Sequence, residues 1–204
     1  MPPFHKLPIA EALSDKLDHI ELVYPVAAKI CSSDIAHKTE IGGVQLSITS
    51  LSELTAAIAS MITCVERHAP NAQLDGILIE SMINNAILEL MVSLRRDPQF
   101  GLVLTLASGG VMTEIYKDAS TVLVPADDIS LVAALESLHI APLFNGFRGG
   151  PAASRTAVLD QIKCLVSLME GTPDIIEIEI NPMMVGTDYA CCADALISIS
   201  GTAA

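Results

Sequence analysis

The sequence has no tryptophan, few other aromatic residues and few basic residues. Aromatic side chains make up 3% of the 204 residues, so Ile, Leu, Val, Ala and Met must build the core, as is usual in α/β layers. Acidic residues number 24 against 11 basic ones, which gives a formal net charge of −13. Such a surface repels phosphate backbones and anionic lipid, so we expect no nucleic-acid and no membrane partner. A small anionic ligand stays possible, because its site needs only a local group of cations and N–H donors.

Paired-cysteine spacings and long apolar runs are also missing. The 5 cysteines show no C-x-x-C spacing, which is typical of reduced thiols in a cytosolic protein. No apolar run reaches the ~18–20 residues of a membrane span, and the N-terminal MPPFHKLP lacks the apolar core of a signal peptide. We therefore expect a cytoplasmic protein. Hydrophobic residues make up 51% of the chain, which excludes disorder.

The spacing of apolar residues predicts helices and strands in an α+β arrangement. Helices are expected at 8–22, 50–67, 128–138 and 152–169. Strands are expected at 26–30, 44–49, 76–82, 86–94, 102–106 and 111–116, followed by a hairpin of 175–185 and 190–199. Because strands occur in runs as well as between helices, mixed sheets with helices packed on them are favoured over a doubly wound parallel sheet. We place the boundary between two lobes after residue 75.

The C-terminal hairpin carries alternating acidic and apolar residues. In IIEIEINPMMV the side chains of Glu177, Glu179 and Asn181 share one face of a strand. A four-residue turn at 186–189 would set Asn181 directly opposite Asp194, about 5 Å away on the same face. Such an all-oxygen cluster suits Mg²⁺ held by one or two carboxylates plus substrate phosphates. The alternative is a solvated acidic face on an amphipathic hairpin.

A lysine in an apolar strand precedes a polar loop that ends in two glycines. Lys29 lies in VAAKI and must reach solvent or an anion, because an unpaired buried ammonium group is costly. The loop after it contains His37, Lys38 and the pair Gly42-Gly43. Glycines allow close approach to a phosphate, and neutral imidazole is a nucleophile near pH 7. A solvated histidine and an ordinary glycine turn are the alternative interpretation of these residues.

Taken together, several segments resemble the ATP-grasp portion of NDP-forming acyl-CoA synthetases, the superfamily of ADP-forming acetyl-CoA synthetase and succinyl-CoA synthetase. The segments are YPVAAKI (24–30), SSDIAHKTEIGGV (32–44), GILIESM (76–82), RRDPQFG (95–101), GGVMTEIYKDA (109–119), FNGFRGGP (144–151), EIEINPMMV (177–185) and ADALI (193–197). They follow the family's order. D-I-x-H-K with G-G-V, and E-I-x-I-N-P with a later D-A, are the most specific of them.

The resemblance implies an ATP-grasp fold of two α+β lobes with mixed or antiparallel sheets flanked by helices, covering residues 1–75 and 76–204. It implies ATP, or another NTP, and Mg²⁺ as ligands. Nucleotide contacts would come from Lys29, Lys38, Glu80 and Met82, and metal ligands from Asn181, Asp194 and Glu179. His37 matches the loop histidine that carries the phosphoryl group toward the acyl site. The implied reaction is acid + CoA + NTP to acyl-CoA + NDP + phosphate.

The chain departs from the family pattern at three positions and lacks one region. Ser93 and Ala107 stand where the family prefers glycine, and Val122 stands near a usual arginine. Added Cβ atoms and a lost cation would weaken nucleotide binding. No G-x-G-x-x-G-type CoA-binding region is present, so the resemblance implies a CoA-binding α-type subunit or fused domain as partner. The alternatives are a degenerate or regulatory nucleotide-sensing module without phosphoryl transfer, and an α/β interaction domain without ligand.

Overall fold

The computed structural model describes residues 2–14, 17, 20–35, 37–110 and 117–201, which form two compact units. The first unit is Pro2–Met82, and the second begins at Ile83. Each unit has its own antiparallel sheet and its own apolar core. The α+β class expected from the sequence is therefore confirmed.

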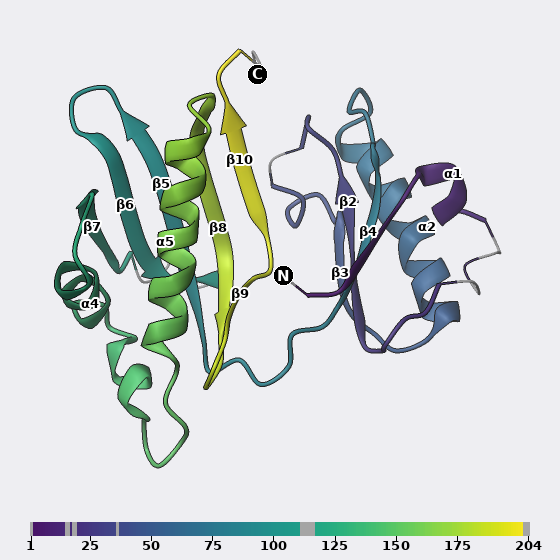
Figure 1. The fold of residues 1–204 in the computed structure, drawn as a ribbon. Helices are drawn as coiled ribbons and strands as arrows, with labels where there is room; N and C mark the ends of the chain where they lie inside the picture. The colour runs from purple at the N-terminus through teal and green to yellow at the C-terminus, as the bar shows by residue number, and fades with distance from the viewer. Residues whose placement is uncertain (1, 15–16, 18–19, 36, 111–116, 202–204) are drawn as a thin grey trace. The chain divides into compact units, whose positions relative to one another are not determined.

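The first unit is a four-stranded sheet covered on one face by a long helix (Figure 1). Its strands are β1 (Phe4–Leu7), β2 (Val26–Cys31), β3 (Val44–Ile48) and β4 (Gly76–Ser81), in the order β1-β4-β2-β3. Helix α2 (Leu51–His68) buries an apolar stripe at helical spacing, formed by Leu54, Ile58, Met61, Ile62 and Val65. The buried residues of β2 and β4 that meet this stripe include Ala28, Ile30, Ile77 and Ile79.

Local polar groups set the ends of the helices in the first unit. Ser50 and Glu53 form an S-x-x-E motif at the start of α2, and the Ser50 hydroxyl caps the helix by accepting a hydrogen bond from the Glu53 N–H. The Glu53 carboxylate bonds the Thr49 N–H and hydroxyl, one residue earlier than a regular box. The helix expected at 8–22 is wrong in extent, since α1 spans only Ile9–Ala12. The Ser14 hydroxyl donates a hydrogen bond to the Glu11 carbonyl oxygen, and such local side-chain bonds compete with continuation of a helix.

The first unit is longer than the sequence suggested. Strand β1 was not expected, and it pairs antiparallel with β4. Because β4 lies between β1 and β2, the first compact unit includes Gly76–Ser81 and extends to Met82, past the boundary expected after residue 75.

The second unit is a six-stranded sheet with helices on one face (Figure 1). Its strands are β5 (Leu88–Asp97), β6 (Gly101–Ser108), β7 (Ala119–Val124), β8 (Ile175–Val185), β9 (Ala190–Cys192) and β10 (Ala195–Ile199). The order is β10-β8-β5-β6-β7, with β9 beside β8. Helices α4 (Asp128–Glu136) and α5 (Arg155–Gly171) pack on it, with the 3₁₀ turn η3 (Ala141–Asn145) between them. Arg96 of β5 donates to the Met169, Thr172 and Ile175 carbonyls and so satisfies the end of α5.

The second sheet differs from expectation in three places. Strand β7 was not predicted, and the segment predicted at 111–116 lies outside the described residues. The last predicted strand is divided into β9 and β10 by residues 193–194. Strict alternation along IIEIEI would place Ile176 in the core with Ile178 and Ile180, but Ile176 is exposed and Ile175 is buried, at the point where the register of β8 against β10 shifts. Among the described residues no helix is long and apolar enough to cross a membrane.

Candidate functional site

Lys29 and Glu80 form a buried ion pair on the face of the first sheet turned away from α2. Ala27 stands opposite Glu80 and Leu78 stands opposite Lys29, so both charged side chains point to the same side. The Lys29 Nζ lies 2.6 Å from the Glu80 Oε2, and the residues are only 9% and 4% exposed. The structure thus brings together two of the expected nucleotide contacts. A buried ammonium group needs such an anion, as the sequence required.

Gly42 and Gly43 shape the loop that carries His37 and Lys38. The Gly43 N–H donates to the Lys38 carbonyl at 2.8 Å, and the Gly42 N–H donates to the Thr39 carbonyl at 3.2 Å. A Cβ on Gly43 would lie 2.7 Å from the Ile30 Cδ1 and 2.9 Å from the Lys38 oxygen. These two N–H groups therefore close the turn between Lys38 and Gly43. His37 is exposed and Lys38 is half-buried.

Met82 follows β4 directly and is held to the preceding segment of the first unit. Its N–H donates to the Pro25 carbonyl at 3.0 Å. Its side chain is half-buried. The backbone that follows Glu80 is therefore anchored at both ends, by the β2–β4 ladder and by this bond.

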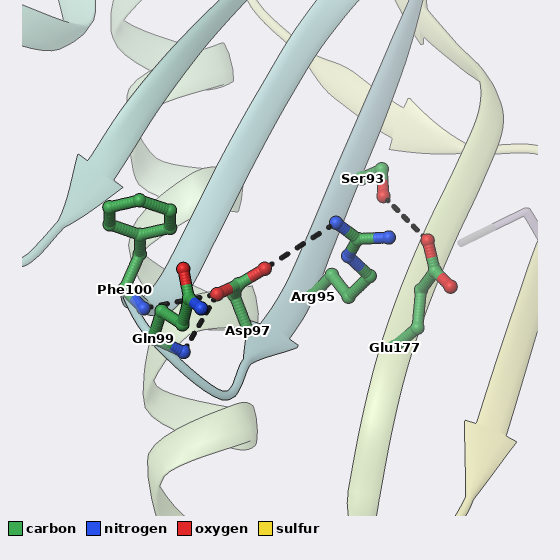
Figure 2. A network of polar contacts seen from close by, with 6 residues as sticks. All are labelled: Ser93, Arg95, Asp97, Gln99, Phe100 and Glu177. Carbon is green, nitrogen blue, oxygen red and sulfur yellow. Dashed lines mark hydrogen bonds and ion pairs between the residues drawn. The ribbon is translucent and has the colours of Figure 1, made fainter.

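The second sheet also has a polar face, opposite the face that α5 covers. Ser93 stands across from Glu179 and Arg95 from Glu177, while the alternate residues Val92 and Leu94 lie in the core. Figure 2 shows the contacts on this face: the Ser93 hydroxyl donates to the Glu177 Oε1 at 3.1 Å. The Arg95 guanidinium lies 3.7 Å from the Asp97 carboxylate. At the turn after β5, the Asp97 Oδ1 accepts from the Gln99 and Phe100 N–H groups.

The Asp97 contacts lower the pKa of its carboxyl group. The Gln99 N–H has the largest effect, followed by the Phe100 N–H and, more weakly, by the Arg95 charge. An Asp that bonds backbone N–H groups two and three residues on stabilises a tight turn. The Asp97 side chain thus stabilises the turn between β5 and β6.

Asn181 and Asp194 face each other across the hairpin, in the register derived from the sequence. Val185 pairs with Ala190 and Ile180 pairs with Ala195. Between these pairs the Asn181 N–H donates to the Asp194 carbonyl oxygen at 3.2 Å. Glu179 lies two residues from Asn181 along β8, on the same face and opposite Leu196.

The side-chain oxygens of Asn181 and Asp194 are fixed by backbone donors. The Gly110 N–H donates to the Asn181 Oδ1 at 2.9 Å, and the Ala195 N–H donates to the Asp194 Oδ1 at 3.0 Å. Each of these oxygens has two lone pairs, so one hydrogen bond does not exhaust it. An amide oxygen and a carboxylate suit a hard cation that keeps waters and phosphates as further ligands. Within the described part of the chain, no three His, Cys, Asp or Glu side chains gather as a metal cage.

Two of the three departures from the family pattern have clear structural roles. Ser93 occupies the polar face and holds Glu177. Val122 is paired with Leu104 and packs on the core, so its side chain lies on the helix-covered side and removes no cation from the polar face. Ala107 is buried opposite Met91.

No pattern in the sequence indicated two charged residues that lie near the candidate site residues, Lys6 in the first unit and Glu89 in the second. Lys6 is on β1, and its strand is too short to show a period. Glu89 is on β5, and its carboxylate packs against Gly110, where a Cβ would lie 1.8 Å from the Glu89 Oε2. The neighbouring Gly109 N–H donates to the Glu89 carbonyl at 2.8 Å. Gly110, with a φ of +71°, is thereby required between Glu89 and Asn181.

Comparison with known proteins gives one consistent result. Residues 10–199 match the ATP-grasp domain family. The chain is 33% identical over 175 residues to the beta subunit of acetate–CoA ligase (ADP-forming) I of Pyrococcus furiosus, which covers 86% of this chain and 75% of the subunit. It is 30% identical over 178 residues to acetate–CoA ligase (ADP-forming) I of Archaeoglobus fulgidus, covering 87% of this chain and 26% of that protein. The chain thus spans about a quarter of the length of the latter relative.

A solved structure shares the fold over nearly the whole chain. It is the dinucleotide-forming acetyl-coenzyme A synthetase 1 of Ca. Korarchaeum cryptofilum, in complex with coenzyme A, Ca-AMPCP and HgCl⁺. The TM-score is 0.86 at 27% identity, and the match covers 98% of this chain and 86% of the other.

Proposed function

The chain belongs to the ATP-grasp family, and from this premise we propose that it is the nucleotide-binding part of an NDP-forming acyl-CoA synthetase. It binds ATP, or another NTP, with Mg²⁺ and accepts the phosphoryl group on His37. The complete reaction, acid + CoA + NTP to acyl-CoA + NDP + phosphate, takes place together with a CoA-binding part. The relatives named as ADP-forming ligases support this reaction class.

The observation that carries the proposal is the buried pair of Lys29 and Glu80. Lys29 is only 9% exposed and its Nζ is held by the Glu80 carboxylate, so it is a preorganised cation. It lies on the face of the first sheet turned away from α2. In this assignment Lys29 and Lys38 bind the phosphates, while Glu80 and Met82 lie beside the base. The solved relative is titled as a complex with the nucleotide analogue Ca-AMPCP, which agrees with this ligand class.

Asn181, Asp194 and Glu179 fit the role of metal ligands. Their oxygens come from one hairpin, and two of them are oriented by the Gly110 and Ala195 N–H groups. A bound Mg²⁺ would offset charge on the transferring phosphoryl group. The few protein ligands agree with the preference of Mg²⁺ for waters and phosphates in its remaining positions.

His37 is assigned as the phosphoryl acceptor. The unprotonated ring nitrogen forms the P–N bond while the P–O bond to the departing nucleoside diphosphate breaks. The resulting phosphohistidine then passes its phosphoryl group to the acyl site. The exposure of His37 is what an acceptor that must reach two sites requires.

Two measurements test the proposal. Calorimetric titration with Mg-ATP should show binding by the parent protein and about 10-fold or weaker binding by Lys29→Met, since a charge-assisted bond contributes about 1.5–3 kcal/mol. Incubation with γ-³²P-ATP should give an acid-labile label in the parent that His37→Ala lacks while still binding nucleotide. Equal labelling of His37→Ala would overturn the acceptor role. Binding without any label would instead indicate a nucleotide-sensing module, and no binding would refute the nucleotide site itself.

A further inference from the structure

Strand β1 places a second lysine in line with Lys29 on the first sheet. Lys6 stands opposite Leu78 of β4, and Leu78 stands opposite Lys29 of β2. Directly opposite residues in neighbouring strands project to the same side of a sheet. Lys6 and Lys29 therefore share the face of the first sheet that is turned away from α2, with Cα atoms about 10 Å apart across two strand spacings.

The Lys6 side chain runs toward the end of β2 from which the His37–Gly43 loop leaves. Its Cε lies 3.8 Å from the position a Cβ would take on Gly76, and Gly76 is paired with Cys31. The electrostatic effect of Lys6 on the Cys31 thiol also places the Lys6 ammonium group near this end of β2. Burial raises the pKa of Cys31, the Lys6 and Lys38 charges lower it, and Asp75 and Glu80 raise it. Lys6 and Lys38 thus approach Cys31 from two different segments.

The charges on this face are unevenly balanced. Lys29 is matched by Glu80 at 2.6 Å. Lys6 is exposed, and no acidic group of the described residues forms an ion pair with its Nζ. Asp75 is the other acid near Cys31. In a chain with 11 basic residues and a net charge of −13, Lys6 and Lys38 near Cys31, together with Lys29 on the same sheet, favour a multiply charged anion in this region.

We infer that Lys6 is a further phosphate-binding residue, acting with Lys29 and Lys38 on the polyphosphate chain of the nucleotide. The inference rests on the proposed function and adds a selectivity to it. A ligand with three phosphates gains from every lysine of the group, whereas a monophosphate reaches only part of it. The site therefore prefers nucleoside triphosphates over monophosphates, and Lys6 supplies part of that preference.

The test compares charge variants of Lys6 in titrations with Mg-ATP and with AMP. Lys6→Gln should weaken Mg-ATP binding about 5-fold, because an exposed ion pair contributes up to about 1 kcal/mol. AMP binding should change by less than about 2-fold on the same scale. Lys6→Arg should bind Mg-ATP like the parent, since it keeps the charge. Lys163→Gln is the matched control. Lys163 is an exposed lysine of α5 that pairs with Asp128, and both residues belong to the second unit, whereas Lys6 belongs to the first.

The outcomes separate this inference from the proposed function. If Lys29→Met weakens Mg-ATP binding but Lys6→Gln does not, the nucleotide site stands and the role of Lys6 is refuted. Equal losses for Mg-ATP and AMP in Lys6→Gln would also refute it, since polyphosphate selectivity would be absent. If the parent binds no nucleotide, the proposed function and this inference are both wrong. Circular dichroism spectra and thermal melts of the Lys6 and Lys163 variants that match the parent exclude misfolding as the cause of a loss. For Lys29→Met, a native circular dichroism spectrum at the assay temperature serves the same purpose, because this variant is expected to melt earlier.

Discussion

At the scale of single residues, the buried pair of Lys29 and Glu80 belongs both to the core of the first unit and to the proposed nucleotide site. Both are buried, and each is the charge partner of the other at 2.6 Å. In a buried pair the desolvation cost of both ions is offset only while they remain together. In the proposed site a phosphate at Lys29 would add a second anion to the same ammonium group, and Glu80 would then both position the lysine and compete for its charge.

A double-mutant cycle on Lys29 and Glu80 tests this coupling. We expect Glu80→Ala to destabilise the protein by about 3 kcal/mol, because it leaves the ammonium group buried without this carboxylate. Lys29→Met alone should cost a similar amount, and the double variant should cost clearly less than the sum of the two. Urea unfolding of the four proteins measures the coupling. Additive losses would show that the pair is not energetically linked.

The sequence could predict residues whose role depends on local pattern. The opposition of Asn181 and Asp194 followed from strand alternation and a turn length, and the structure confirms this register. The need of Lys29 for an anion followed from its apolar neighbours, but its partner could not be named, since Glu80 is far away in the sequence. The position of Lys6 could not be predicted, because it depends on the pairing of β1 with β4, and these strands lie at opposite ends of the first unit's sequence.

At the scale of elements, the turn between β2 and β3 is held by packing at Gly43. The Gly43 Cα lies against Ile30, and its N–H closes the turn on the Lys38 carbonyl. A Cβ there would approach a backbone oxygen at 2.9 Å, which a side-chain rotation cannot relieve. The loop that carries His37 and Lys38 is therefore positioned by the core of the first unit.

Gly43→Ala should move this turn and destabilise the protein by about 1–3 kcal/mol, the usual cost of overpacking. Gly171→Ala is the matched control, because no atom lies within 4 Å of its added Cβ at the end of α5. That change should be neutral or slightly stabilising in a helix. Thermal melts and Mg-ATP titrations on both variants check the prediction, with weaker nucleotide binding expected for Gly43→Ala alone. Equal behaviour of the two alanine variants would contradict it.

Elements with strong local signals were predicted, and those fixed by distant contacts were not. The caps of α2 and α4 are formed by Ser50 and Asp127, which accept from N–H groups three residues on. Helices α4 and α5 lie where the apolar spacing placed them. By contrast, the sequence of β7, ASTVLV, does not alternate clearly between polar and apolar residues. Its strand is defined by the pairing with β6, in which exposed and half-buried side chains alternate.

At the scale of the whole molecule, each unit is stabilised by one aliphatic core, and the chain carries an excess of negative charge. The cores contain Leu, Ile, Val, Met and Ala with a single buried Phe144, as the scarcity of aromatic residues required. The position at which the chain passes from one unit to the other was not readable from the sequence. It depends on whether β4 pairs with the strands before it or after it, and this choice is made by long-range ladders.

The acidic surface gives the folded protein a defined pH dependence. Hydrogen-bond donors lower the pKa of three carboxyl groups. The largest effect comes from the Thr49 N–H for Glu53, from the Gln99 N–H for Asp97, and from the Ser130 side chain, followed by the Ser130 N–H, for Asp127. A lowered pKa means that the unfolded chain takes up these protons first. Their contribution to stability is therefore present above the ordinary pKa and lost as the pH falls through the folded value. Burial raises the pKa of the Cys31 and Cys192 thiols from its ordinary value, which removes stability on the alkaline side as the pH rises.

We therefore expect a stability plateau at neutral pH with a decline below about pH 4 and another above about pH 9. Urea unfolding from pH 3 to pH 10 measures both limbs. Asp97→Asn separates charge from turn geometry, because its amide oxygen still accepts from the Gln99 and Phe100 N–H groups. The variant should unfold near the parent midpoint at pH 7 or slightly earlier, and it should lose less stability than the parent on acidification. An unchanged acid limb in Asp97→Asn would mean that these surface turns do not govern the acid stability of the molecule.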